Sequence, residues 1–174
     1  MKKCLIVVDY QNDFVDGALG FKGADSIEDT IIDKITTYHN NNDDVIFTKD
    51  THDDAYLEKE EGKNLPVKHC IKGTKGHDLR DRVKHAKHQN DKVFEKPTFP
   101  SLELGNYLKE TPYDTIELCG LVSHICVLSN AVIAKAACPN AHIIVDKNAT
   151  KSYDETLHQK ALDVMAGIHI DIIE

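Results

Sequence analysis

The sequence predicts a three-layer α/β/α fold with a six-stranded, mainly parallel, doubly wound sheet. Short apolar runs alternate with helix-like patterns along the 174 residues, as they do where helices cover both faces of a parallel sheet. The first run, residues 5–8, is apolar at every position, which is typical of a strand buried on both faces. Charged or reactive side chains follow several runs, and sheets of this class bind ligands beyond the carboxyl ends of their strands.

Each element of this fold is predicted from its own pattern. The apolar runs predict strands at residues 5–8, 45–48, 92–95, 115–119, 142–145 and 168–173. Helices are expected at residues 27–38, 77–85, 102–108, 127–137 and 153–166. The first helix has the clearest start, because Asp25 or Ser26 can cap it and its apolar residues share one face. Residues 50–76 are polar and contain glycine and proline, so they are expected to form a long functional loop.

Composition and charge limit the classes of function. At this length, residues 1–174 are expected to form a single domain. Asp and Glu outnumber Lys and Arg by 29 to 21, a formal charge of −8 that argues against nucleic acid or a membrane as partner. The apolar run after Met1 is too short for a signal peptide, and no stretch approaches the length of a membrane span. Five cysteines, an odd number without framework spacing, favour a cytoplasmic location.

A candidate nucleophile lies at a predicted strand-to-helix turn, in the segment 120–126 that reads GLVSHIC. Unpaired backbone N–H groups and the positive end of the helix converge at such a turn. This environment is expected to lower the pKa of the Cys126 thiol and to stabilise an oxyanion, as a thiol nucleophile requires. The alternative is a buried cysteine that packs as a small apolar residue.

Two charged residues follow other strands and can serve this thiol. Asp9 ends the apolar run 5–8, where a carboxylate is costly unless it is paired. We predict that Asp9 accepts the Cys126 proton; the alternative is a turn-forming aspartate. Lys96 lies between the third predicted strand and Pro97. A lysine held there keeps a carboxylate and a thiolate ionised, whereas the alternative is a solvated surface lysine.

The long predicted loop contains side chains of the kinds that bind metal ions. Asp50 and His52 lie on the same side of an extended segment, and His69 follows later in the loop. One carboxylate and two imidazoles would form one face of a divalent-metal site and leave positions open for water or substrate. We favour this interpretation over a plain polar loop. Glu61 is an optional fourth ligand, although it belongs to an acidic run that solvent alone can explain.

Five segments together resemble the nicotinamidase group of the isochorismatase-like cysteine hydrolases. They are VDYQNDF at residues 8–14, KDTH at 49–52, PVKHCIKGT at 66–74, EKPTF at 95–99 and GLVSHICV at 120–127. No single segment is decisive, but all five occur in the family's order and at compatible separations. The resemblance covers nearly the whole chain, from residue 8 to the last predicted strand.

The resemblance implies a Rossmann-like fold and an amidase that converts nicotinamide to nicotinate and ammonia through a thioester. The implied catalytic triad is Asp9, Lys96 and Cys126. It also implies a cis peptide bond between Leu121 and Val122. The backbone N–H groups of Val122 and Cys126 are then the expected oxyanion donors.

The same resemblance implies a metal-dependent, cytoplasmic enzyme of NAD salvage that forms a homo-oligomer. Its substrate would be a small carboxamide. Its cofactor would be one divalent metal ion, with Zn²⁺ expected and Mn²⁺ or Fe²⁺ as alternatives, because all three accept a carboxylate and two imidazoles. The implied ligands are Asp50, His52 and His69, with Glu61 optional. Phe14 and Phe99 are candidates for the walls on either side of an aromatic ring, or for ordinary core packing.

Some positions depart from the family pattern and leave alternatives open. Ser123-His124 stands where the family usually has Thr-Asp or Thr-Glu, and Leu65 stands where many relatives have Trp. A relative that acts on another small amide or carbamoyl compound is therefore the first alternative. A nonenzymatic nucleotide-binding module is another, although no glycine-rich fingerprint follows the first strand. His124 is a less favoured base for Cys126, because side chains two residues apart at a helix start diverge.

Overall fold

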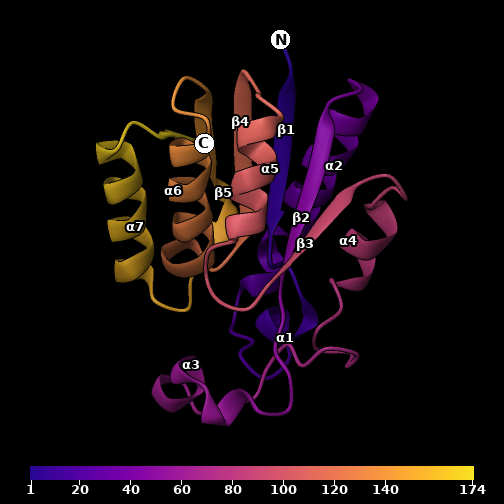
Figure 1. Cartoon of the computed structure of the whole chain (residues 1–174), viewed down its shortest axis with the longest axis vertical. Helices are drawn as coiled ribbons and strands as arrows, with labels where there is room; N and C mark the ends of the chain where they lie inside the picture. The colour runs from indigo at the N-terminus through magenta and orange to yellow at the C-terminus, as the bar shows by residue number, and fades with distance from the viewer.

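The computed structural model describes residues 1–174 and contains one six-stranded sheet (Figure 1). Its strands are β1 (Lys3–Val8), β2 (Asp44–Asp50), β3 (Lys92–Lys96), β4 (Thr115–Leu121), β5 (His142–Lys151) and β6 (Asp171–Ile173). They lie in the order β3-β2-β1-β4-β5-β6, and every neighbouring pair is parallel. The predicted fold class is therefore confirmed, with a sheet that is wholly rather than mainly parallel.

Helices cover both faces of this sheet (Figure 1). The helices of the chain are α1 (Asn12–Val15), α2 (Glu28–Asn40), α3 (Glu60–Asn64), α4 (Asp81–Ala86), α5 (Leu102–Glu110), α6 (Leu128–Ala137) and α7 (Glu155–Gly167). Of these, α1 and α3 lie beyond the end of the sheet (Figure 1). Two 3₁₀ turns, Ala24–Ile27 and Tyr56–Glu58, and one π-helical turn, Ser123–Val127, complete the elements. None of the helices has the length and the apolar character that crossing a membrane requires.

Strand β1 separates two apolar cores. Its residues Cys4, Ile6 and Val8 face the core that α5, α6 and α7 cover. The alternate residues Leu5 and Val7 face the second core, which includes the buried face of α2. Because successive side chains of a strand point to opposite faces, only a run that is apolar throughout can serve both cores. This explains the pattern of residues 5–8.

Four predicted elements differ clearly from the structure. The strand predicted at residues 142–145 continues to Lys151 as β5. Residues 77–80 are not helical; the backbone of Arg80 bonds instead to the Tyr10 carbonyl, and Leu79 pairs with Gln11, so tertiary pairing overrides the local pattern. The predicted long loop contains a 3₁₀ turn and α3. The last strand begins at Asp171 rather than at residue 168, because Ile168 and His169 still form the turn that ends α7.

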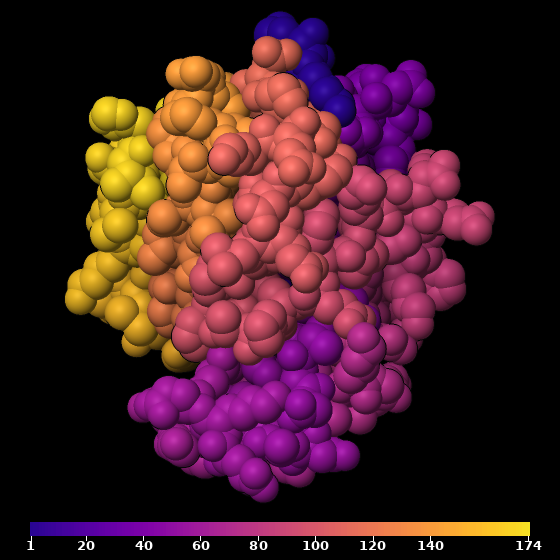
Figure 2. Space-filling view, viewed as in Figure 1, coloured from indigo at the N-terminus to yellow at the C-terminus, as the bar shows by residue number.

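The topology brings several chain segments to one end of the sheet. The order of the strands reverses between β1 and β4, and ligands bind at such a switch point. The residues that follow β1, β2 and β4 all emerge at this end, where α1 and α3 also lie (Figure 1). The segment that follows β2 forms the lower end of the molecule in the space-filling view (Figure 2). The candidate site is therefore built between the carboxyl ends of the strands and this segment.

Candidate active site

The structure brings Asp9, Lys96 and Cys126 together at the switch point. Asp9 directly follows β1, Lys96 ends β3, and Cys126 lies in the π-helical turn after β4. The ammonium Nζ of Lys96 lies 2.6 Å from Asp9 Oδ2 and 3.6 Å from Cys126 Sγ. Lys96 is 1 % exposed and Asp9 is fully buried, so neither is a surface charge. The sequence placed these three residues at strand ends, and the parallel pairing of β3, β2, β1 and β4 makes them neighbours.

Thr48 fixes the orientation of the Asp9 carboxylate. Its hydroxyl donates a hydrogen bond of 2.6 Å to Asp9 Oδ1, and its carbonyl accepts the Asp9 backbone N–H. The Asp9 backbone has a φ of 46°, a conformation that aspartate tolerates better than most residues. Sequence reasoning missed this residue. The available signal was a single polar side chain in the otherwise apolar run 45–48.

The charges of this group depend on burial as much as on proximity. Burial raises the pKa of Cys126 well above 9.0, and the nearby Lys96 charge offsets only part of this effect. The expected lowering of the Cys126 pKa by the helix end is therefore wrong for the isolated protein, because desolvation outweighs it. Burial also raises the pKa of Asp9. Burial alone would lower the pKa of Lys96, but the acidic groups around it, with Asp9 first among them, together outweigh burial and raise that pKa. Lys96 is thus held as a cation beside a thiol and a basic carboxylate.

A second group, which we call the cation cluster, consists of Asp50, His52, Glu61 and His69. One ligand atom from each of these side chains lies within 4.8 Å of all the others. The Nε2 atoms of His52 and His69 lie 3.0 and 3.1 Å from the same Asp50 oxygen, Oδ2. Glu61 Oε1 lies 3.5 Å from His52 Nε2 and 3.8 Å from His69 Nε2. Asp50 ends β2 and Glu61 belongs to α3, so the start and the middle of the predicted loop meet here.

The donor atoms of the cation cluster fit a divalent metal ion. His69 Nδ1 lies 2.8 Å from the Val67 carbonyl, which can only accept, so Nδ1 carries a proton. In a neutral imidazole, Nε2 then presents its lone pair to the Asp50 carboxylate, and two such acceptors need a cation between them. Glu61 Oε2 is buried without a hydrogen-bond partner. Two imidazoles with carboxylates are the ligands that Zn²⁺, Mn²⁺ and Fe²⁺ accept.

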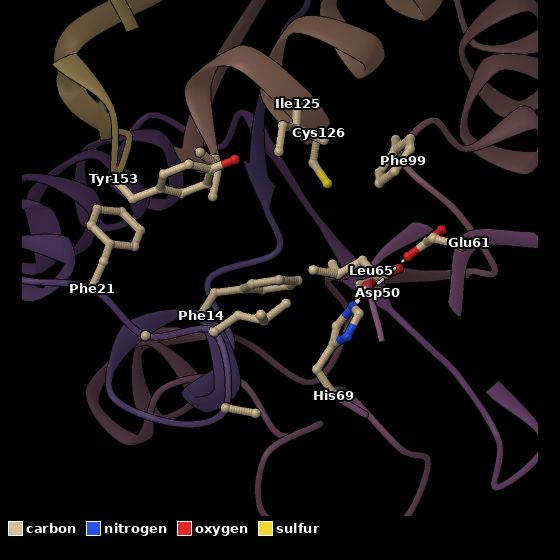
Figure 3. A pocket seen from close by; sticks show the side chains of 14 residues that line it. Phe14, Phe21, Asp50, Glu61, Leu65, His69, Phe99, Ile125, Cys126 and Tyr153 are labelled. Atoms are coloured by element: carbon tan, nitrogen blue, oxygen red, sulfur yellow. Dashed lines mark hydrogen bonds and ion pairs between the residues drawn. The ribbon is translucent and has the colours of Figure 1, made fainter. Parts of the chain in front are cut away.

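A cavity of about 360 Å³ joins the two groups (Figure 3). Cys126 and Val122 line it from the β4 side, and three members of the cation cluster, Asp50, Glu61 and His69, line the opposite wall. The fourth member, His52, contacts Asp50 and does not line the cavity. Both predicted ring walls, Phe14 and Phe99, line this cavity. Phe14 also belongs to the core beneath the cavity, so its packing role is confirmed, and its role as a ring wall stays a prediction. Most of the lining is apolar, with the reactive groups at a few points, as is common in small-molecule sites.

The isochorismatase domain is the family whose model matches this chain, over residues 3–174. The chain belongs to the isochorismatase family.

Several relatives are similar to this isochorismatase-family protein over nearly their whole length. An isochorismatase family protein PncA of Bacillus subtilis (strain 168), which is described as uncharacterized, is 35% identical over 96% of each chain. The solved structure of nicotinamidase PncA from Bacillus subtilis has a TM-score of 0.87 at 33% identity and covers 100% of both chains. A pyrazinamidase/nicotinamidase structure from Streptococcus mutans UA159 has a TM-score of 0.86 at 32% identity, over 99% of this chain and 100% of that one.

Two residues that sequence reasoning missed support the cation cluster of this isochorismatase-family site. Gln11 is fully buried, and its amide bonds to the backbone of Asp50 and to the His77 carbonyl. Asp13 accepts the backbone N–H of Cys70 at 2.7 Å and so holds the segment that carries His69. Cys70 itself supports the site through its carbonyl, which accepts the His52 backbone N–H. The available signal was a run of polar residues directly after β1.

The turn that carries the nucleophile has two further expected features. The peptide bond between Leu121 and Val122 is cis, as the resemblance implied. His124 does not pair with Cys126: its Nδ1 lies 3.0 Å from Ser152 Oγ, and its ring packs against Tyr153. The alternative in which His124 is the base is therefore not supported by this arrangement.

Proposed function

We propose that this protein is a nicotinamidase, a cysteine amidohydrolase that converts nicotinamide to nicotinate and ammonia. One observation carries the proposal: the Cys126 thiol shares a buried cavity with the Asp9–Lys96 pair and the cation cluster. Two relatives at 32–33% identity, a nicotinamidase and a pyrazinamidase/nicotinamidase, support the substrate class. In this proposal Asp9, Lys96 and Cys126 form the catalytic triad.

The first half of the reaction forms a thioester. Asp9 accepts the Cys126 proton, and its raised pKa suits a proton acceptor. The sulfur attacks the carboxamide carbon, and Lys96 stabilises the negative charge in a site that largely excludes water. The backbone N–H groups of Val122 and Cys126 hold the oxyanion. The C–N bond then breaks, its electron pair stays on nitrogen, and Asp9 returns the proton, so that ammonia leaves.

The second half of the reaction hydrolyses the thioester. A water molecule attacks the same carbon while Asp9 accepts its proton. The C–S bond breaks, its electron pair returns to Cys126, and the thiol is reprotonated. Nicotinate leaves the cavity, where Phe14 and Phe99 flank the ring. Each residue thus ends in the state in which it began.

The cation cluster is proposed to hold one divalent metal ion through Asp50, His52 and His69, with Glu61 as a fourth ligand. We propose Zn²⁺, with Mn²⁺ or Fe²⁺ as alternatives. Bound there, the metal supplies Lewis-acid chemistry and a ligand position beside the cavity. The side chains themselves orient the ring and close the wall of the cavity opposite Cys126.

The wider setting of the enzyme is also a proposal. One sheet spans the chain from residue 3 to residue 173, which supports a single domain. All five cysteines are free, which supports a reducing cytoplasm. A role in NAD salvage follows from the proposed conversion of nicotinamide. The exposed apolar side chains of Leu102 on α5 and Val132 on α6 support a homo-oligomer, because such residues are common at subunit contacts.

An ammonia-release assay with nicotinamide tests the proposed function. The wild-type protein, loaded with a divalent metal, is expected to release equal amounts of ammonia and nicotinate. Cys126→Ala is expected to abolish release. Cys138→Ala changes a buried cysteine at the C-terminal end of α6 and is expected to leave release unchanged. Undiminished turnover in Cys126→Ala would refute the proposal.

A further inference from the structure

The cavity continues past the nucleophile, away from the cation cluster. Figure 3 shows Cys126 between the two ends, with Asp50, Glu61 and His69 at one end and Phe21 and Tyr153 at the other. We call the second end the apolar lobe; its lining residues are Leu19, Phe21, Ile125 and Tyr153. The proposed reaction leaves this lobe without a role, because its leaving group is only ammonia.

The apolar lobe has the character of a binding surface for a hydrophobic group. Phe21 and Tyr153 meet edge to face, with ring centroids 6.2 Å apart, and the His124 ring also packs edge to face with Tyr153, with centroids 5.1 Å apart. The Leu19 backbone N–H bonds to the Asp13 carbonyl at 2.8 Å, which fixes the loop that carries it. Tyr153 is 60% exposed, so the lobe opens to solvent. The lobe is thus preformed, apolar and accessible.

The size of the cavity exceeds what nicotinamide needs. A volume of about 360 Å³ lies in the range, roughly 300–1,000 Å³, that encloses drug-sized ligands. Nicotinamide is a single ring with one small substituent. A ring held between Phe14 and Phe99 near the cation cluster leaves the apolar lobe empty. Water in such a lobe gains few hydrogen bonds, so an apolar group that displaces it binds favourably.

The shape of a secondary amide matches this arrangement. In a trans amide, the group on the carbonyl carbon and the group on nitrogen extend in opposite directions. With the ring at the cation cluster and the carbonyl carbon at Cys126, the nitrogen substituent points toward the apolar lobe. We propose that this protein also hydrolyses N-substituted nicotinamides whose nitrogen carries an apolar group, and that Phe21 and Tyr153 bind that group. This inference rests on the proposed amidase function.

The chemistry of the proposed reaction balances without any new reactant. The Cys126 sulfur forms a bond to the carbonyl carbon, and the C–N bond breaks with its electron pair on nitrogen. Asp9 returns one proton to that nitrogen, so the leaving group is a primary amine instead of ammonia. Water hydrolyses the same nicotinyl thioester as before. Only the leaving group differs, and the apolar lobe is where it lies.

N-benzylnicotinamide is the probe, because benzylamine and ammonia are similarly basic and their departure is similarly easy. The metal-loaded protein is incubated with nicotinamide or with N-benzylnicotinamide, and nicotinate and benzylamine are measured by liquid chromatography and mass spectrometry. We expect equal amounts of the two products, with a kcat/KM within about tenfold of that for nicotinamide. Quinoline-3-carboxamide, a primary amide with a larger ring, tests whether the lobe accepts the ring side instead.

Two variants distinguish a loss of binding in the apolar lobe from a general loss of activity. The double variant Phe21→Ala/Tyr153→Ala is expected to lower kcat/KM for N-benzylnicotinamide by about tenfold or more and to leave that for nicotinamide within about twofold. Val164→Ala removes an exposed apolar side chain of α7 outside the cavity and is expected to change neither value.

The outcomes are distinguishable. If nicotinamide is hydrolysed and N-benzylnicotinamide is not, or only inhibits without releasing benzylamine, the inference about secondary amides is wrong and the amidase function stands. Turnover of N-benzylnicotinamide that the double variant does not reduce, or turnover of quinoline-3-carboxamide alone, also overturns it. If neither amide is hydrolysed, the proposed function itself fails.

Discussion

The side chain of Gln11 clamps the backbone of Asp50 on both sides. Gln11 Oε1 accepts the Asp50 N–H at 2.7 Å, and Gln11 Nε2 donates to the Asp50 carbonyl at 2.9 Å. The same Nε2 donates to the His77 carbonyl at 2.9 Å. Gln11 thereby joins the end of β1 to the end of β2 and fixes the residue to which both histidines of the cation cluster point.

Gln11→Ala is expected to weaken both folding and metal binding. The change leaves the buried N–H and carbonyl of Asp50 without partners, so the free energy of unfolding should fall by about 2–4 kcal/mol. Metal affinity should fall by about 10–100-fold, as when a supporting residue of a metal site is lost. Urea denaturation and metal titration measure the two effects. Gln159→Ala, at an exposed position of α7, is the matched control, and an equal loss there would contradict the role of Gln11.

Asp9→Asn is expected to affect stability and catalysis together. It removes the partner of a lysine that is 1 % exposed, and breaking a buried ion pair costs about 3–5 kcal/mol. Loss of the proton acceptor should lower kcat by about 10²–10⁴-fold. Thermal denaturation and ammonia release check the two results. Asp53→Asn makes the same change in an exposed pair with Lys59 and should lower neither the stability nor kcat. Wild-type turnover by Asp9→Asn would exclude Asp9 as the base.

Iodoacetamide is expected to modify Cys126 before the other four cysteines. Burial raises the pKa of Cys126, but this thiol faces the cavity beside the Lys96 ammonium. Cys119 is fully buried, and burial raises its pKa without a lysine in contact with its sulfur. Peptide mass spectrometry after brief treatment locates the label, and nicotinamide should slow labelling. First labelling at Cys138, which is 7% exposed outside the cavity, would contradict this expectation.

Removal of the metal is expected to abolish activity and to lower the melting temperature, because a ligand that binds only the folded state stabilises it. Dialysis against a chelator, followed by calorimetry and ammonia release, measures both. His52→Ala should reduce the bound metal, measured by elemental analysis, from about one equivalent to near zero. His85→Ala changes an exposed histidine of α4 and should leave the metal content unchanged. Full metal content in His52→Ala would show that the cation cluster is not the binding site.

A salt-bridge network away from the site predicts a pH dependence of stability. Lys34 on α2 lies 2.7 Å from Glu117 of β4 and 2.6 Å from Asp146 of β5. Burial alone lowers the pKa of Lys34, but hydrogen bonds to Asp146 and Glu117 outweigh it and raise the pKa above its usual 10.5. The folded state therefore binds the Lys34 proton more tightly than the unfolded state. This contribution is complete below pH 10.5 and is lost as the pH rises through the raised pKa.

Lys34→Met tests this network. The change leaves two buried carboxylates facing each other without a cation, so we expect the free energy of unfolding at neutral pH to fall by about 3 kcal/mol. The part of the wild-type stability that is lost above pH 10.5 should be absent in the variant. Urea denaturation across this pH range gives both values, with Lys160→Met on the exposed side of α7 as control. Equal pH profiles for wild type and Lys34→Met would contradict the assignment.

Much of the fold could be predicted from the sequence, because the local pattern and the tertiary structure agree there. Residues 5–8 are apolar throughout, and only a strand between two cores uses such a run. The helix face formed by Ile31, Ile35 and Tyr38 is buried as its spacing predicts. Residues 77–80 show where the pattern fails. Their backbone pairs with residues 10 and 11, which are distant in sequence, and no local periodicity encodes such a pairing.

The candidate site, like the fold, has features that the sequence predicts and others that only the tertiary structure decides. The sequence by itself determined which residue types follow each strand, and hence which of Asp9, Lys96 and Cys126 can meet, because parallel strands end at one edge of a sheet. Only the tertiary structure decided how they interact. It buried the Cys126 thiol and so raised its pKa, placed Thr48 and Gln11 as supports, and opened the apolar lobe beside Tyr153. Desolvation and cavity shape depend on all the surrounding atoms at once, and these atoms come from segments far apart in the chain.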